Sequence, residues 1–335
     1  MTNIDQWRTK VGRSTYEGEA AARAQAHKWH SFKPHLVAPQ GSAQFKSVLE
    51  IAGLSEIAFR SAKRGHKISM SVASATAITF AALYIFKADQ KAAELALVSL
   101  ALTLFFFADY KITVADLQSL KSRAKFVNKA YEFGGLLYSW LTFMLVIGLA
   151  QLALMHFYSQ DEVYIQYGAF YESISKGEAW RFLTGPYLHS GFTHWITNLL
   201  VLTLAAPVSA TMSRPGSIVA FVLGNIFACI VMYALKLAGL NSVDVYVGVS
   251  AGLYAMLGLA MGVAFFGKDR DIQLGFTIAL FLTMSLVITA VMNPNAANSA
   301  HIAGAAIGIV IALSLPSSWL TAEREKQKSH PPGHS

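Results

Sequence analysis

The sequence contains little charge and almost no cysteine. Only 14% of its 335 residues are charged, against about 25% in ordinary soluble domains. Hydrophobic residues make up 54% of the chain, and the mean hydropathy is +0.42. These values exclude a disordered chain, a coiled coil and a typical cytosolic enzyme. The single cysteine, Cys229, excludes an internal disulfide and a cysteine-based metal cluster.

The N-terminal region lacks an apolar stretch. Its first 40 residues are polar, so we expect no signal peptide. We expect residues 1–42 to be loosely ordered. In residues 43–64, apolar side chains recur at helical spacing between charged ones. This pattern predicts an amphipathic helix, either on the membrane surface or packed within a small cytosolic segment.

Long apolar runs dominate the remainder of the chain. Each is long enough to cross a bilayer, and together they predict an all-α membrane protein with about eight spans, at 67–86, 92–110, 134–157, 194–212, 217–237, 246–266, 274–292 and 300–316. The first two runs form a hairpin, which a polar linker separates from a six-helix core. The predicted divisions are an N-terminal segment (1–66), a hairpin with its linker (67–133), the core (134–316) and a polar tail (317–335).

Basic residues predict the orientation of these spans. With eight spans, both termini lie on one side of the membrane. Of the 27 lysines and arginines, 22 fall on that side and five on the other, namely Lys87, Lys91, Lys176, Arg181 and Lys236. Positive charge collects on the cytosolic side, so both termini are expected there. This explanation of the net charge of +8 leaves no role for a nucleic-acid partner.

The connection between the third and fourth spans is long and aromatic. Residues 158–193 contain five tyrosines together with Phe170, Trp180, Phe182 and Phe192. Tyrosine and tryptophan favour the headgroup region. We therefore expect this loop to lie partly in the interface on the non-cytosolic side.

A serine opens the sixth apolar run. Residues 248–252 read Gly-Val-Ser-Ala-Gly, the pattern of a nucleophile elbow. That elbow requires a strand–turn–helix context, and a long apolar, glycine-spaced run excludes the soluble α/β-hydrolase fold. Ser250 remains a candidate nucleophile at the start of a membrane helix, although a serine in a span more often bonds its own backbone.

A histidine opens the eighth run. An imidazole among apolar residues requires a partner. Gly304 and Gly308 share the helical face of His301, and Tyr254, Gly258 and Gly262 follow that of Ser250. Small residues at this spacing let helix backbones approach closely. We therefore predict that Ser250 meets His301. The alternative is ordinary small-residue packing with incidental polar groups.

This pairing predicts a Ser–His dyad, because no Asp or Glu occurs at 245–268 or 272–316. Tyr254 is placed to stack on the ring of His301. At the start of the fourth span, His194 and Asn198 lie on one helix face. With the Ser250 amide they are candidate donors to an oxyanion. His189 and His194 lack the HExxH pattern, so no metal is expected.

Taken together, these motifs resemble the rhomboid family of intramembrane serine proteases. The resemblance covers about 134–316 and rests on motifs in order: Trp180-Arg181, His189 with His194 and Asn198, Gly248-Val249-Ser250 with Tyr254 and Gly258, and Ala300-His301 with Gly304 and Gly308.

The resemblance implies that Ser250 is the nucleophile and His301 the base, with an oxyanion hole of His194, Asn198 and the Ser250 amide. It implies a six-helix core, transmembrane protein substrates and no cofactor. By the same analogy, the seventh span, with Phe276 and Phe281, is a lateral gate. The loop 293–299 is expected to cap the site. Two features depart from the family: Ala251, where many members have glycine, and the additional hairpin at 67–110.

Three functions are compatible with these features. The first is an intramembrane serine endopeptidase whose site opens to the non-cytosolic side, in a bacterial inner membrane. The second is a catalytically silent rhomboid-like protein that binds membrane clients or serves in quality control; retention of Ser250 and His301 disfavours it. The third is a transporter, disfavoured because no symmetry between halves is visible.

Overall fold

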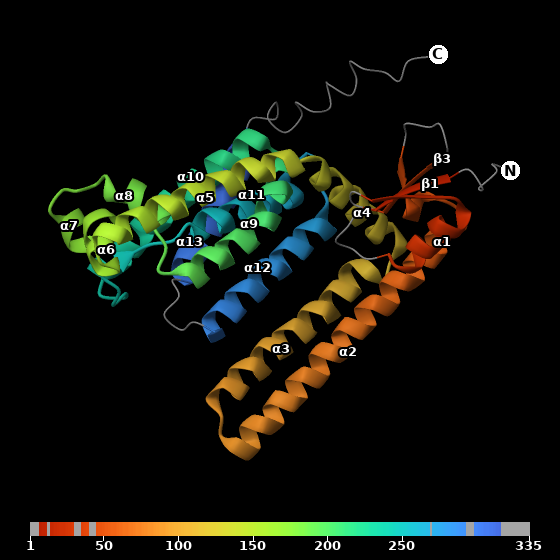
Figure 1. Ribbon diagram of the computed structural model, residues 1–335, viewed down its shortest axis with the longest axis horizontal. Helices are drawn as coiled ribbons and strands as arrows, with labels where there is room; N and C mark the ends of the chain where they lie inside the picture. Colours follow the sequence, from red (N-terminus) through yellow and green to blue (C-terminus); the bar gives the residue numbers. More distant parts are fainter. Residues whose placement is uncertain are drawn as a thin grey trace, which may run out of the picture. The chain divides into compact units, whose positions relative to one another are not determined.

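The computed structural model describes residues 7–11, 14–29, 35–39, 45–268, 270–292 and 298–315. It divides into two compact units, residues 1–132 with 276–296 and residues 133–275 with 297–335. Helices dominate both units (Figure 1), and six described helices are long and apolar enough to cross a membrane. The predicted all-α membrane class is thereby confirmed. The described helices α11 and α13 are shorter, with 17 residues each.

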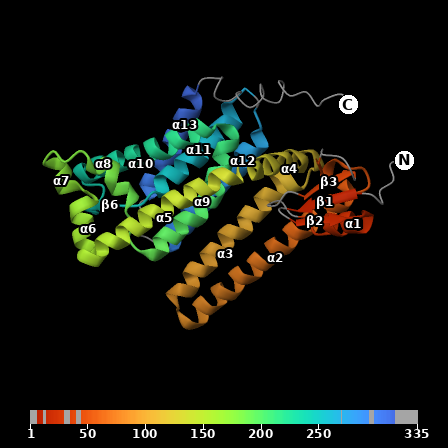
Figure 2. The ribbon, with the colours of Figure 1, turned by 45° about the horizontal axis from the view of Figure 1, so that its top comes forward.

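The first unit begins with a small sheet. Its elements are β1 (Trp7–Val11), β2 (Ser14–Glu17), α1 (Glu19–His27), β3 (His35–Pro39), β4 (Lys46–Ser47), a 3-10 turn (Val48–Glu50), α2 (Ser55–Lys87), α3 (Gln90–Asp109), a π-helical turn (Tyr110–Val114) and α4 (Leu117–Glu132). The sheet is antiparallel with order β2-β1-β3-β4, and Figure 2 shows β1, β2 and β3 beside α1.

The expectation of a loosely ordered segment over 1–42 is therefore wrong for the residues described there. Strands of four or five residues show too little alternation to be separated from coil by pattern alone. The helix predicted over 43–64 also begins later, at Ser55, because Gly53 adopts a φ of +83°, which is incompatible with a right-handed helix.

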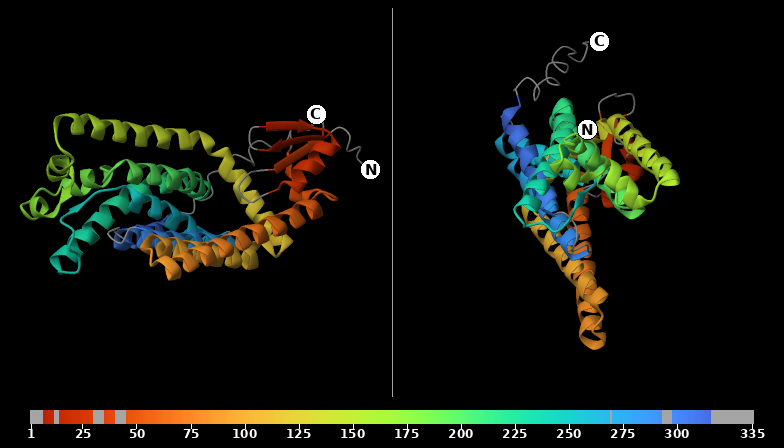
Figure 3. Two further views of the ribbon diagram at one scale, coloured as in Figure 1. Left: turned by 60° about the horizontal axis from the view of Figure 1, so that its bottom comes forward. Right: turned by 90° about the vertical axis from the view of Figure 1, so that its left-hand side faces the viewer.

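The linker predicted over 111–133 contains α4, whose inner face completes this unit's core. Leu120 and Ala124 pack in one cluster with Ala58 and Ala62 of α2 and with Val37 of β3. From this core α2 runs without a break to Lys87. Ala88 then adopts a left-handed conformation (φ 50°), and Asp89 caps α3 by accepting a hydrogen bond from the Lys91 N–H at 2.9 Å. Helices α2 and α3 thus form the predicted hairpin, side by side (Figure 3).

A buried charged cluster lies at the base of the hairpin. Asp109 of α3 accepts hydrogen bonds from the Arg123 guanidinium of α4 and lies 2.7 Å from His66 Nε2 of α2. Arg123 Nη2 also donates to Thr113 at 2.7 Å and to Thr277 of α12 (Ile272–Met292) at 2.8 Å. Asp109 is only 3% exposed, so this one carboxylate ties the hairpin to α4, and Arg123 extends the network to α12.

The second unit contains the helices of the predicted core except α12, of which it has only the first turn, because residues 276–296 belong to the first unit. Its described elements are α5 (Gly134–Phe157), α6 (Gln160–Tyr167), β5 (Ala169–Phe170), α7 (Tyr171–Ser175), α8 (Arg181–Thr184), a 3-10 turn (Gly185–Tyr187), α9 (Phe192–Met212), α10 (Arg214–Leu237), β6 (Val245–Tyr246), α11 (Ser250–Phe266) and α13 (Asn298–Ser314), with the first turn of α12. Helices α9, α10 and α13 all pack against α11, which is buried along most of its length.

Arg181 organises the loop between α5 and α9. Its guanidinium is buried and donates to the carbonyl oxygens of Ile165 (2.8 Å) and Gly168 (2.9 Å), while its Nε donates to Glu178 at 2.7 Å. Next to Gly168, strand β5 pairs with β6, and β6 lies a few residues before Ser250. The arginine therefore fixes the loop that holds the segment leading to the serine.

Replacing the buried carboxylate should destabilise the first unit strongly. We expect Asp109→Ala to lower the free energy of unfolding by about 3–5 kcal/mol, because it leaves the Arg123 charge buried without its partner. The measurement is reversible unfolding of the whole chain in mixed detergent micelles. The matched control is Asp244→Ala, which removes an exposed ion pair with Lys236 and should cost at most about 1 kcal/mol. An equal effect of the two changes would contradict this role.

A second stability prediction concerns Arg181. Arg181→Ala should lower the free energy of unfolding by about 1.5–3 kcal/mol, because hydrogen bonds from a charged donor to two backbone carbonyls are lost. Arg181→Lys should recover only part of this, since an ammonium does not reproduce the guanidinium fork. Protease sensitivity of residues 160–187 in the folded protein provides the readout. Full protection in Arg181→Ala would show that other contacts hold the loop.

Candidate active site

Ser250 is the first residue of α11. The expected span at 246–266 starts four residues later than predicted, because Gly248 adopts a left-handed φ of +116° that ends the extended segment after β6. As the first helical residue, Ser250 has a backbone N–H with no acceptor inside the helix. The serine itself is partly exposed, whereas the helix behind it is buried. The turn thus presents both the hydroxyl and the amide of Ser250 at the end of a buried helix.

A side chain from another helix caps this end of α11. Asn225 of α10 is fully buried, and its Oδ1 accepts a hydrogen bond from the Gly252 N–H at 2.9 Å. A side chain added to Gly252 would overlap Asn225. Asn225 is not among the residues predicted from the sequence, although an amide in the middle of an apolar span is a signal of function or of a specific partner.

Ser250 and His301 lie in contact. The hydroxyl oxygen of Ser250 is 2.8 Å from Nε2 of His301 on α13. The two helices approach at the level of their backbones: a Cβ at Gly304 would overlap the carbonyl oxygen of Ala251, one at Gly308 that of Ala255, and one at Gly258 that of Ala305. The glycines singled out in the sequence therefore lie where α11 and α13 touch.

Tyr254 lies flat against the histidine. Its ring is 4.4 Å from that of His301, with an interplanar angle of 4°. His301 is buried, and within the described residues its Nδ1 has no hydrogen-bond partner. For Nε2 to accept the serine proton, the ring proton must lie on Nδ1, an assignment made from this hydrogen bond. Stacking on Tyr254 orients the ring of His301, as an acidic third residue orients the histidine in Ser-His-Asp hydrolases.

His194 and Asn198 come from the first two turns of α9. His194 is partly exposed and Asn198 is buried. A Cβ at Gly248 would lie 2.6 Å from Cε1 of His194, so the glycine admits the imidazole to the turn that carries Ser250. The Nδ2 group of Asn198 has no hydrogen-bond partner in the described part of the chain. Two donor side chains are thus present on the helix adjoining α11.

Ser190 contacts His194 and is not among the residues predicted from the sequence. Its hydroxyl lies 2.9 Å from Nδ1 of His194. If this hydroxyl donates, Nδ1 is the acceptor and the ring proton of neutral His194 lies on Nε2. Serine at this spacing is common in loops, which explains why the pattern alone gave no signal.

His189 lies in the loop before α9, and among the described residues its backbone is held by Gln151 and Tyr164. Its backbone N–H donates to Gln151 Oε1 (2.8 Å), and its carbonyl oxygen accepts from Gln151 Nε2 (2.7 Å) and from the Tyr164 hydroxyl (2.8 Å). Its ring is 5.5 Å from that of His194. Burial, with a smaller contribution from His194, lowers the pKa of His189 to about 4, so the ring is neutral near pH 7.

Trp180 and Arg181 contact each other in the loop between α5 and α9. Trp180 is 44% exposed, and the Arg181 guanidinium lies over its ring at 4.7 Å. The pair reaches Ser250 only through the loop and the β5–β6 pairing. Phe276 and Phe281 belong to the other unit. Residues 293–297 of the predicted cap lie outside the described residues. Within the described ranges, no three His, Cys, Asp or Glu side chains are grouped to hold a metal ion.

The chain matches one protein-family model and one known relative. The model of the Rhomboid domain matches residues 176–318. A protein of Bacillus subtilis (strain 168) described as "Putative rhomboid protease YdcA" is 24% identical over 157 residues, which cover 46% of this chain and 73% of the relative. The matched region contains all residues placed around Ser250 in α9, α10, α11 and α13. The chain therefore contains a region, residues 176–318, that is similar to the Rhomboid domain.

Proposed function

We propose that this protein is an intramembrane serine endopeptidase that cleaves transmembrane proteins within or beside their membrane helices. The contact that supports the proposal most directly is the 2.8 Å hydrogen bond between Ser250 Oγ and His301 Nε2. Proteolysis is general in the rhomboid family, and its preference for helix-weakening residues near the cut is expected here by analogy.

In the proposed reaction, Ser250 Oγ attacks the carbonyl carbon of the scissile peptide while His301 Nε2 takes its proton. The resulting imidazolium then protonates the leaving amine nitrogen, and the carbon–nitrogen bond breaks to leave an ester on Ser250. Water attacks this ester, His301 accepts a proton from the water, and the proton returns to Ser250 as the acid product leaves. Partial exposure of Ser250 and His194 is consistent with entry of substrate and water.

The oxyanion is assigned to three donors: the Ser250 amide, Asn198 Nδ2 and His194 Nε2. Each suits the role for a separate reason. The amide is the first of its helix, and the Asn198 group is buried with no partner in the described part of the chain. The Ser190 hydroxyl lies 2.9 Å from Nδ1 of His194, and when it donates there the proton of neutral His194 is on Nε2. Donors oriented before the reaction stabilise developing charge at no further reorganisation cost.

The membrane and the orientation are also part of the proposal. The chain is a multi-pass integral membrane protein. We place it in a bacterial inner membrane with cytosolic termini and with Ser250 near the non-cytosolic side, on the distribution of basic residues.

Loss of the nucleophile is the first test. Ser250→Ala should lower cleavage of a model transmembrane substrate by at least about 10⁴-fold, with unchanged thermal stability in detergent. A fluorophosphonate probe should label Ser250 in the wild type and fail to label His301→Ala. Ser242→Ala, in the exposed loop before β6, is the control and should retain both reactions.

Cleavage by Ser250→Ala at the wild-type rate would refute the proposal. Failure of the probe to react with a folded wild type that still binds a transmembrane client would favour the silent rhomboid-like alternative.

Ser190 provides a second test, of the orientation of His194. Ser190→Ala should lower kcat about tenfold with little change in KM, because a mixture of His194 tautomers weakens one oxyanion donor. Ser190→Thr, which keeps the hydroxyl, should restore most of kcat. Steady-state kinetics on a fluorogenic membrane substrate separates the two constants. An equal loss in the alanine and threonine variants, or an effect on KM alone, would exclude this positioning role.

A further inference from the structure

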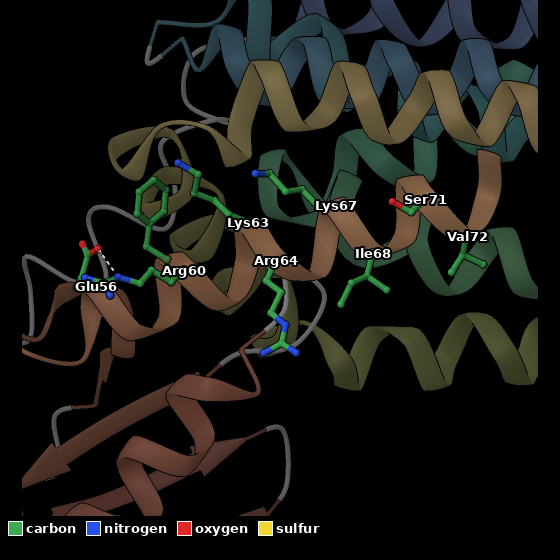
Figure 4. A pocket seen from close by; sticks show the side chains of 9 residues that line it. Glu56, Arg60, Lys63, Arg64, Lys67, Ile68, Ser71 and Val72 are labelled. Atoms are coloured by element: carbon green, nitrogen blue, oxygen red, sulfur yellow. Dashed lines mark hydrogen bonds and ion pairs between the residues drawn. The ribbon is translucent and has the colours of Figure 1, made fainter. Parts of the chain in front are cut away.

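One face of α2 outside the predicted active site is strongly basic. Arg60, Lys63, Arg64 and Lys67 follow one another at helical spacing on this face, and Ile68, Ser71 and Val72 continue it toward the hairpin. With Glu56 and Phe59 these side chains line a groove of about 540 Å³. Figure 4 shows Lys63 and Lys67 along one edge of the helix and Arg64 and Ile68 along the other. We refer to it as the basic groove.

Most of the charge in the basic groove is unpaired. Arg60 bonds Glu56 at 2.8 Å, and Lys63 lies over the Phe59 ring at 4.9 Å. In the described part of the chain, no carboxylate lies within ion-pair distance of Lys63, Arg64 or Lys67. The opposite face of the same helix packs in the core through Ala58 and Ala62. Among the described residues, the groove therefore presents three cations that have no carboxylate partner.

The position of the basic groove relative to the bilayer follows from the length of α2. From Ile68 to Lys87 the helix has 20 residues, which span about 30 Å, the thickness of the hydrocarbon core. The basic side chains lie in the two turns just outside this length, which is the headgroup layer. Ile68 and Val72, 53% and 60% exposed, lie just inside it.

We propose that the basic groove binds the headgroup of an anionic phospholipid, whose acyl chains lie along Ile68 and Val72. A phospholipid presents a phosphate next to an apolar chain in the order in which the groove presents cations and apolar side chains. An acidic protein segment would match the cations but would leave Ile68 and Val72 uncovered. The site depends on membrane insertion and not on the chemistry proposed for Ser250.

The test measures which lipids the whole protein retains. Wild type is reconstituted in nanodiscs of phosphatidylcholine with a minority of phosphatidylglycerol, and the lipids bound after detergent extraction are counted by native mass spectrometry. We expect enrichment of phosphatidylglycerol in the wild type. The enrichment should fall at least fivefold in the variant R60Q/K63Q/R64Q/K67Q. This lower bound corresponds to the contribution of about one cation at an anionic surface.

The control variant, K87Q/K91Q/K176Q/K236Q, removes the same number of charges at other positions and should keep the enrichment. The exchange R60K/K63R/R64K/K67R keeps the charge and should also keep it, which separates charge from folding. Ser250→Ala should behave as the wild type, so loss of proteolysis and loss of lipid binding are distinguishable.

Three results would overturn the proposal: equal enrichment in the wild type and the glutamine variant of the groove, an equal loss in the control variant, or displacement of the lipid by excess inorganic phosphate. Binding of a soluble polyglutamate peptide without phosphatidylglycerol enrichment would assign the groove to an acidic protein partner instead.

Discussion

The arrangement around Ser250 depends on contact between two helix backbones. Gly258 on α11 and Gly304 and Gly308 on α13 leave no side chain at the points of closest approach. A serine and a histidine on different helices can hydrogen-bond only if the helices are this close, because neither side chain is long. Tyr254 and Asn225 then act within that frame: one orients the imidazole, and the other caps the helix that begins with the serine. The site is thus a property of helix packing more than of any loop.

Much of this packing is readable from the sequence. Apolar runs of sufficient length identify the helices, because a helix satisfies its backbone hydrogen bonds within one continuous segment in hydrocarbon. Glycines at fourfold spacing next to an isolated serine and an isolated histidine predict which faces meet. Asn225 carried the same signal as His301, a polar group in an apolar run, and was overlooked because it has no reactive chemistry of its own.

Other features could not be predicted from the sequence, for physical reasons. The strands of the first unit are too short to give a periodic signal, and their stability comes from side chains distant in the chain, such as Leu120 and Ala124. The start of α11 at Ser250 depends on the backbone of Gly248, and glycine tolerates both the helical and the left-handed conformation. The contact of Ser190 with His194 is local, but serine contacts of this kind are too common in loops to be predictive.

Helix α2 has a mechanical consequence. Its 33 residues run from the core of the first unit to the far end of the hairpin with no intervening loop, a length of about 50 Å. Such a helix moves as a rigid rod. Tilting it by about 10° about one end displaces the other by roughly 9 Å. Any change in bilayer thickness that alters the tilt of this span is therefore amplified into displacement of the small sheet attached to it.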